Sequence, residues 1–314
     1  MSQTTSSNDT PVNANLHSIV LMIAAMGFFT IADLLIKIAS ELMPVGQAML
    51  GLGAGSVVVF LVLMRIKREP VRLVPLRQPA MVLRNVGDFV GSTSMCLALA
   101  YVPISTIGAV IQAVPLMLTA AGALFLGERV GLRRLSAILV GFLGVLFILQ
   151  PGGTEFDAMV ILALMAAVGL TVRDIGTKLV SRDVPTLLVS LYGATIFTFS
   201  GALLLSITGG AVWPDAAMIV MFLAMIALGS VGYICVVNSI RIGEMSVVSP
   251  FRYSRLLFAV AVGVMVLGEE INAMMLFGCA LTIGAGLYIW RRELVLKPEA
   301  GPAAAADDAG VSSR

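Results

Sequence analysis

Two stretches of this sequence, 30–44 (TIADLLIKIASELMP) and 171–185 (TVRDIGTKLVSRDVP), decide how the chain folds. They lie 141 residues apart and share the spacing Thr-x-x-Asp-x-x-x-Lys-x-x-Ser, followed by a proline. Apolar residues coincide by chance in any hydrophobic chain, but charged residues that coincide at one fixed offset do not. The pattern therefore indicates an internal duplication.

The same offset relates positions far from these two stretches. Gly91 falls on Gly232, Ser105 falls on Ser246, and the tripeptide LGE at 126–128 recurs at 267–269. Each copy contains five predicted helices, and five is odd, so the second copy enters the membrane in the opposite orientation to the first. Inverted repeats of this kind are typical of secondary transporters, in which the substrate lies between the two halves.

The composition places most of the chain in lipid. Hydrophobic residues make up 59% of the 314 residues, charged residues make up 12%, and the mean hydropathy is +1.00. An ordinary globular protein has about 25% charged residues. A spanning helix needs about 20 mostly apolar residues. Ten stretches meet this requirement: 17–39, 45–65, 80–100, 104–126, 133–150, 157–178, 186–207, 216–239, 245–267 and 272–291.

The predicted fold is an all-α membrane protein with ten transmembrane helices in two inverted five-helix repeats, 17–150 and 157–291. Residues 1–16 and 292–314 are polar or of low complexity, which predicts disordered tails. Basic residues gather in alternate loops, so both termini are predicted to be cytoplasmic, in a bacterial inner membrane. Lipid is then the chain's surroundings, and nucleic acid is not an expected partner, since the net charge is only +2.

Residues for catalysis or metal binding are scarce. His17 is the only histidine, and three cysteines, Cys96, Cys235 and Cys279, lie within apolar runs without metal-ligand spacing. The sequence also lacks the G-x-x-x-x-G-K-[ST] motif that binds nucleotide phosphates. We therefore assign no catalytic residue, no metal and no cofactor, and we do not expect ATP to drive any transport.

The stretch 98–152 resembles a known family. It reads ALAYVPISTIGAVIQAVPLMLTAAGALFLGERVGLRRLSAILVGFLGVLFILQPG. The AL-x-Y helix end, the small-residue helix with Pro115, the LGE turn and the glycine-rich helix are similar to the EamA domain of the drug/metabolite transporter superfamily. The second copy departs from the pattern at Leu256, which replaces Pro115, and has Pro250 earlier in the helix. The resemblance covers residues 17–291.

This resemblance implies ten helices with cytoplasmic ends and the transport of small metabolites. The expected function is that of a secondary transporter which moves a small polar molecule by alternating access, with the substrate bound near the midplane. A non-transporting scaffold or sensor and an intramembrane enzyme are the alternatives. Asp88 and Asp174 could form the carboxylate dyad of such an enzyme. A coupling proton or ion is a further expected partner, and the sequence leaves a homodimer open.

The charges inside the predicted spans fall into two classes. The first class is shared by both repeats and consists of Asp33 with Lys37 and Asp174 with Lys178, each pair spaced i,i+4. That spacing places a carboxylate and an ammonium on one helix face, where each can neutralise the other. The two interpretations are structural ion pairs, and gating or coupling groups in which Asp33, Asp88 or Asp174 carries a proton.

The second class occurs in one repeat only. Buried charge is costly, so it requires a partner or a water-filled cavity. Fold maintenance would be shared by both repeats, whereas substrate recognition need not be. We therefore predict that the unmatched charged residues Arg84, Asp88, Arg173, Arg252 and Arg255 bind substrate, with Gln112 and Tyr253, which align with each other in the repeat, as further hydrogen-bonding groups. The surplus of arginine favours an anionic or carbonyl-rich substrate such as riboflavin, an amino acid or a nucleotide-like metabolite. Salt bridges between helices, such as Asp88 with Arg255, are the alternative.

Overall fold

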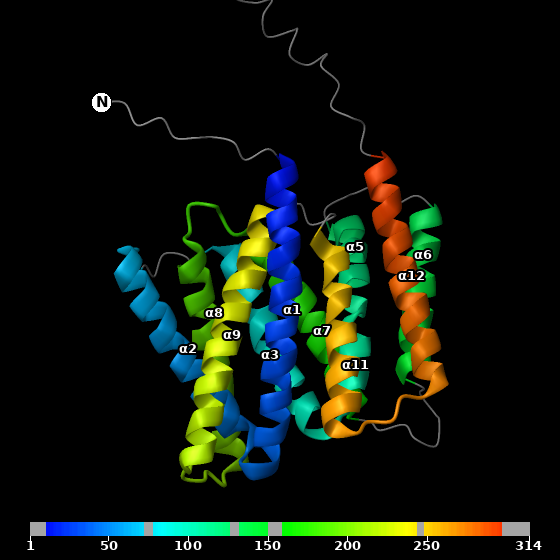
Figure 1. Ribbon diagram of the computed structural model, residues 1–314. Coiled ribbons are helices and arrows are strands. Elements are labelled where there is room, and N and C mark those ends of the chain that lie inside the picture. Colours follow the sequence, from blue (N-terminus) through cyan, green and yellow to red (C-terminus); the bar gives the residue numbers. More distant parts are fainter. Residues whose placement is uncertain (1–10, 72–77, 126–131, 150–158, 244–247, 297–314) are drawn as a thin grey trace, which may run out of the picture.

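The computed structural model describes residues 11–71, 78–125, 132–149, 159–243 and 248–296, which form helices and short turns without a strand (Figure 1). The helices are α1 (Pro11–Leu42), α2 (Val45–Lys67), α3 (Pro79–Tyr101), α4 (Ile104–Ile111), α5 (Ala113–Phe125), α6 (Leu132–Leu149), α7 (Val160–Leu179), α8 (Thr186–Thr208), α9 (Ala216–Ile242), η2 (Ser249–Tyr253), α11 (Ser254–Leu267) and α12 (Ala273–Leu296). The all-helical fold predicted from the sequence is confirmed for these residues.

Seven helices are long and apolar enough to cross a membrane: Leu16–Leu42, Val45–Lys67, Val160–Leu179, Thr186–Thr208, Ala216–Ile242, Pro250–Leu267 and Ala273–Arg292. The other three predicted spans coincide with α3, with α4 and α5 together, and with α6. The count of ten spans therefore stays a prediction. In Figure 1, α1 begins and α12 ends at the same end of the bundle, as an even number of crossings requires.

The ends of the chain differ from the prediction. Helix α1 begins at Pro11 and α12 continues to Leu296, so residues 11–16 and 292–296 are helical rather than parts of the tails. The remainder of both predicted tails lies outside the described residues. The same holds for the predicted repeat boundaries at 150 and 157 and for the first LGE turn at 126–128.

The predicted span 104–126 is divided into two helices. Helix α4 ends at Ile111, Gln112 follows, and α5 begins at Ala113. Pro115 explains the division, because it has no N–H to donate to the carbonyl of Ile111 and its ring collides with that carbonyl in a regular helix. In the second half, the 3₁₀ helix η2 contains Pro250 and α11 begins at Ser254. The two divisions fall at the same repeat position.

Residues at equivalent repeat positions contact each other directly. The Gln112 side-chain amide donates to the Tyr253 carbonyl over 3.3 Å, and the Thr282 hydroxyl donates to the Gly141 carbonyl over 3.2 Å. In both pairs the partners are 141 residues apart. Equivalent residues can touch only near the axis that relates the two halves. These contacts therefore place the pseudo-twofold axis between α4/α5 and η2/α11, and between α6 and α12.

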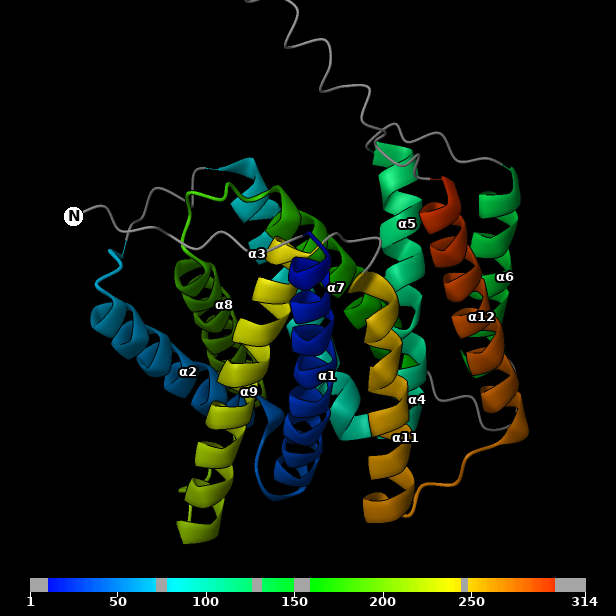
Figure 2. The same cartoon turned by 45° about the horizontal axis from the view of Figure 1, so that its top comes forward.

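The two repeats are not separate bodies, because the helices of one half pack directly on the helices of the other half. The most extensive helix pairings are α3 with α7, α2 with α8, α1 with α9 and α6 with α12, and each joins one half to the other (Figure 2). Glycines permit the closest approach. A Cβ added to Gly169 of α7 would lie 2.3 Å from the Gly91 nitrogen of α3. The interface between the repeats is thus the centre of the molecule.

Candidate functional site

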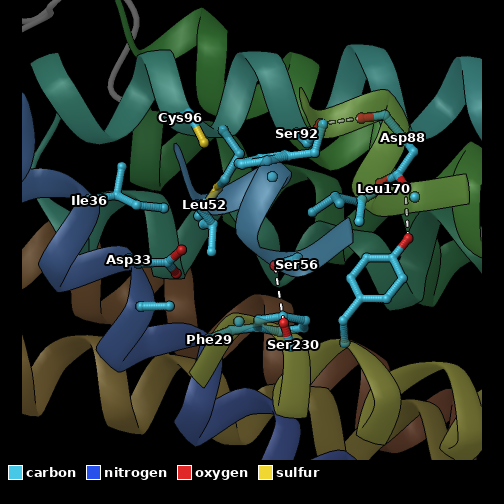
Figure 3. A pocket seen from close by; sticks show the side chains of 18 of the residues that line it. Phe29, Asp33, Ile36, Leu52, Ser56, Asp88, Ser92, Cys96, Leu170 and Ser230 are labelled. Atoms are coloured by element: carbon cyan, nitrogen blue, oxygen red, sulfur yellow. Dashed lines mark hydrogen bonds between the residues drawn. The ribbon is translucent and has the colours of Figure 1, made fainter. Parts of the chain in front are cut away.

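A cavity lies in this central interface, among α1, α2, α3, α7, α8, α9 and α11 (Figure 3). The cavity has a volume of about 130 Å³. Most of its wall is apolar. The polar groups are few and include Asp33, Asp88, Arg173 and Arg255. Figure 3 shows Asp33 and Asp88 at opposite sides of the cavity, with Ser56 and Ser230 between them.

The cavity is built from equivalent positions of the two halves. Fourteen of its lining residues form seven repeat-related pairs, each 141 residues apart: Phe29 with Leu170, Ala32 with Arg173, Leu52 with Gly193, Gly53 with Ala194, Ser56 with Phe197, Asp88 with Gly229, and Ser92 with Tyr233. In each of the seven pairs, the two positions carry different residue types. The duplication therefore supplies the shape of the cavity, and later divergence supplies its chemistry.

Asp33 and Arg255 form the simplest ion pair in the cavity. The Arg255 Nη2 atom lies 2.5 Å from Asp33 Oδ2 and donates a hydrogen bond to it, which joins α11 to α1. The guanidinium also lies over the ring of Phe29, 6.0 Å from the ring centroid. Both charged side chains are about one tenth exposed. Among the described residues, each group has the other as its single ionic partner.

Asp88 is held by more partners. It accepts a hydrogen bond of 2.7 Å from the Tyr233 hydroxyl, and it lies 3.6 Å from Arg84 and 3.8 Å from Arg173. The Arg84 guanidinium in turn donates to the Tyr233 oxygen and to the Asn85 side chain. Arg84 is fully buried behind Tyr233 and does not line the cavity. It therefore holds Tyr233 and Asp88 in place.

Asp174 lies outside the cavity wall and is completely buried. Arg173 approaches one of its oxygens to 3.0 Å, and Arg252 approaches the other to 2.7 Å. Arg173 thus connects Asp174 with Asp88, and Arg252 is occupied by Asp174 alone. Among the described residues, the charges that line the cavity are two aspartates, Asp33 and Asp88, and two arginines, Arg173 and Arg255, which balance each other.

The lysines do not pair with the aspartates of their own helices, contrary to one prediction from the i,i+4 spacing. The Lys37 ammonium donates to the carbonyls of Leu99 and Val102, over 3.2 and 3.0 Å. The Lys178 ammonium donates to the carbonyls of Ile240 and Gly243, both over 3.0 Å. The acceptors are equivalent repeat positions at the carboxyl ends of α3 and α9. A cation is favoured there, because the last carbonyls of a helix lack internal partners.

The structure therefore divides these predicted site residues into three groups. Asp33, Asp88, Arg173 and Arg255 line the cavity, and Arg84 and Arg252 contact the cavity's carboxylates or their neighbours from behind. Gln112 and Tyr253 contact each other near the pseudo-twofold axis instead of facing the cavity. The suggested salt bridge between Asp88 and Arg255 is replaced by separate partners for each residue.

Several lining residues were missed by the sequence reasoning. The aromatic wall consists of Phe29, Phe60, Phe197 and Tyr233, and the Ser230 hydroxyl donates to Ser56 over 3.0 Å. Tyr233 carried a detectable signal, since its repeat equivalent is Ser92 and such unmatched polar positions were the criterion for the site. The phenylalanines carried none, because an apolar ring inside a spanning helix faces lipid as readily as a cavity.

Glu269, in the second LGE turn, has a structural role. Its carboxylate accepts from the backbone N–H groups of Ile104 and Ser105, over 2.7 and 3.0 Å, and from the Ser105 hydroxyl over 2.6 Å. These are the first residues of α4, where N–H groups lack helical partners. The end of α11 is thereby fastened to the start of α4.

Two named bacterial transporters illustrate what the chain is similar to. It is 23% identical over 209 residues to an S-adenosylmethionine uptake transporter of Rickettsia prowazekii, a match that covers 66% of this chain and 70% of the other. It is 27% identical over 212 residues to a riboflavin transporter of Rhizobium johnstonii, covering 67% and 70%. Each similarity extends over about two thirds of the chains compared, and the two relatives are named for different metabolites.

A crystal structure shares the fold. Its chain superposes with a TM-score of 0.63 at 17% sequence identity, over 92% of this chain and all of the other. The model of the EamA-like transporter family matches twice, at residues 16–150 and 157–291. The two matches reproduce the two halves that the 141-residue offset defines, and they leave out only short terminal and connecting segments. This chain therefore belongs to the EamA-like transporter family.

Proposed function

We propose that this protein is a secondary transporter of a small polar metabolite, which binds in the cavity between the two repeats. The observation that carries the proposal is the set of seven repeat-related pairs in the cavity wall. A cavity shared equally by two inverted halves can open to one side or to the other when the halves rock against each other. Transport by alternating access follows from that symmetry. The basic residues in alternate loops support a cytoplasmic location for both termini.

The chemistry of the cavity wall narrows the range of candidate substrates. Four aromatic rings offer stacking surfaces for a flat ring system, and the arginines offer donors for carbonyl or anionic oxygens. S-adenosylmethionine carries a sulfonium cation, which would disturb the balance of two aspartates and two arginines in the cavity wall. Riboflavin is neutral, flat and rich in carbonyl groups. We therefore select riboflavin as the first substrate to test and S-adenosylmethionine as the comparison.

The test is uptake of labelled riboflavin into liposomes that contain the purified protein. Wild-type protein should accumulate riboflavin above protein-free liposomes, and Arg255→Gln should retain less than about a tenth of that rate, since one charged contact is worth about 1.5–3 kcal/mol. Arg65→Gln, at the exposed end of α2, is the matched control and should transport at the wild-type rate. Equal rates for Arg255→Gln and the control would contradict the placement of the site. Absence of uptake with both metabolites would exclude these substrates.

A further inference from the structure

We infer that the Asp33–Arg255 ion pair is the device that couples substrate binding to proton uptake. The inference rests on the proposed function and deepens it. A substrate oxygen that binds Arg255 displaces Asp33 from its single ionic partner, and the carboxylate then takes up one proton from the compartment to which the cavity is open. Release of the substrate on the other side restores the ion pair and expels the proton on that side. Substrate and proton therefore travel in the same direction.

The first argument is the number of partners of each buried carboxylate. Asp174 lies between two guanidinium groups at 2.7 and 3.0 Å, and Asp88 has a tyrosine hydroxyl and two arginines. If a substrate takes one arginine from either residue, another partner still compensates the charge. Asp33 has Arg255 alone among the described residues. An uncompensated carboxylate in a buried site is strongly disfavoured, and protonation is the least costly remedy.

The second argument is access. Asp33 and Arg255 both line the cavity, whereas Asp174 and Arg252 do not. The repeat explains why: the residue before Asp174 is Arg173, while the residue before Asp33 is Ala32. The first half therefore supplies no arginine of its own to Asp33. Its guanidinium comes from α11 across the interface, where a ligand in the cavity can compete for it.

Among the residues that the structure describes, Asp33 has no second cation within contact. Lys37, on the same helix, is occupied by the carbonyls of Leu99 and Val102. The titratable or charged groups that face this region from the packed elements are Cys96 and Asp88 on α3, Arg173 on α7, Tyr233 on α9, Arg252 on η2 and Arg255 on α11. Arg173 and Arg252 are held by Asp174, and Tyr233 donates to Asp88. When Arg255 leaves, no described neighbour replaces it.

The experiment measures riboflavin affinity of the purified protein between pH 6 and pH 8. Binding that takes up one proton loses affinity as the pH rises, by up to tenfold per pH unit. In the wild type we expect this loss, together with uptake of about one proton per bound riboflavin in a weakly buffered solution. Asp33→Asn has no carboxylate to displace, so its affinity should be independent of pH and higher than that of the wild type at pH 8. Asp183→Asn, an exposed carboxylate, is the control and should keep the wild-type slope.

A pH-independent wild-type affinity, or an unchanged slope in Asp33→Asn, would overturn the coupling while leaving transport intact. A second measurement is independent of the substrate. Removal of the guanidinium in Arg255→Gln should protonate Asp33 and produce the infrared carbonyl band of a carboxylic acid at pH 7. The band should be missing from the double variant Asp33→Asn with Arg255→Gln. If Arg255→Gln shows no such band, the coupling is refuted even when riboflavin proves to be the wrong substrate.

Discussion

Asp33 and Asp174 occupy the same position in the two repeats, yet their surroundings differ. Asp174 is fully buried between two guanidinium groups, outside the cavity. Asp33 faces the cavity and has one guanidinium, which comes from the other half of the chain. The duplication kept both carboxylates, and the unequal distribution of arginines gave them unequal environments. We infer from this difference that Asp174 fixes the fold, whereas Asp33 can exchange its ionic partner.

The largest expected effect separates these two aspartates by stability. Asp174→Asn leaves two buried guanidinium groups without their shared counterion, and we expect a loss of about 3–5 kcal/mol and poor recovery from the membrane. Asp33→Asn leaves one guanidinium without its counterion instead of two, so the loss should be markedly smaller. Thermal denaturation in detergent measures both. If both variants are destabilised equally, the proposed difference between a fixed Asp174 and an exchangeable Asp33 is wrong.

The lysines provide the opposite case, in which the two halves should behave alike. Lys37 and Lys178 donate to equivalent pairs of carbonyls, so Lys37→Met and Lys178→Met should each cost about 1.5–3 kcal/mol. The same denaturation assay applies. In addition, Lys37→Met and Asp33→Asn should be additive to within about 0.5 kcal/mol, because the two side chains do not pair. A coupling energy well above that value would restore the i,i+4 ion pair that the sequence spacing suggested.

Two tyrosines of the second half should differ from each other, and the smallest effect of all is expected from Tyr253. Tyr233→Phe removes the hydroxyl that bridges Arg84 and Asp88, which should cost about 1.5–3 kcal/mol and reduce transport. The Tyr253 hydroxyl is buried and has no hydrogen-bond partner among the described residues. Tyr253→Phe should therefore change stability by less than about 0.5 kcal/mol. Transport loss in Tyr253→Phe at normal protein levels would mean that Tyr253 contacts substrate after all.

The sequence predicted the architecture well because its strongest signals are local. Hydropathy locates the helices, and the matching Asp-x-x-x-Lys and Leu-Gly-Glu patterns reveal the repeat without any knowledge of packing. The sequence predicts a single helix over the span 104–126, and its division at Gln112 is seen only in the structure. Three of the unmatched charges, Asp88, Arg173 and Arg255, line the cavity, in keeping with the need to compensate a charge that is buried in a membrane.

The ionic partner of each charged residue could not be predicted from the sequence, because it depends on distances across the interface between the repeats. The i,i+4 rule proposes Lys37 as the partner of Asp33, but free carbonyls at the end of α3 compete for the ammonium, and Arg255 reaches Asp33 from a residue 222 positions away. The aromatic wall was also invisible, because Phe29 and Phe197 look like any lipid-facing side chain. Only the packing of α1 and α8 shows which way they face.

A cysteine that the chain already contains tests most directly whether the cavity between the repeats holds the substrate. Cys96 lines the cavity, whereas Cys235 and Cys279 do not. In a variant with Cys235→Ala and Cys279→Ala, a small thiol reagent should modify Cys96 slowly, and saturating riboflavin should reduce that rate at least several-fold. Cys235 alone, in the matching variant with Cys96→Ala and Cys279→Ala, should react at the same rate with and without riboflavin. If riboflavin is transported but leaves the modification of Cys96 unchanged, the substrate does not bind in this cavity.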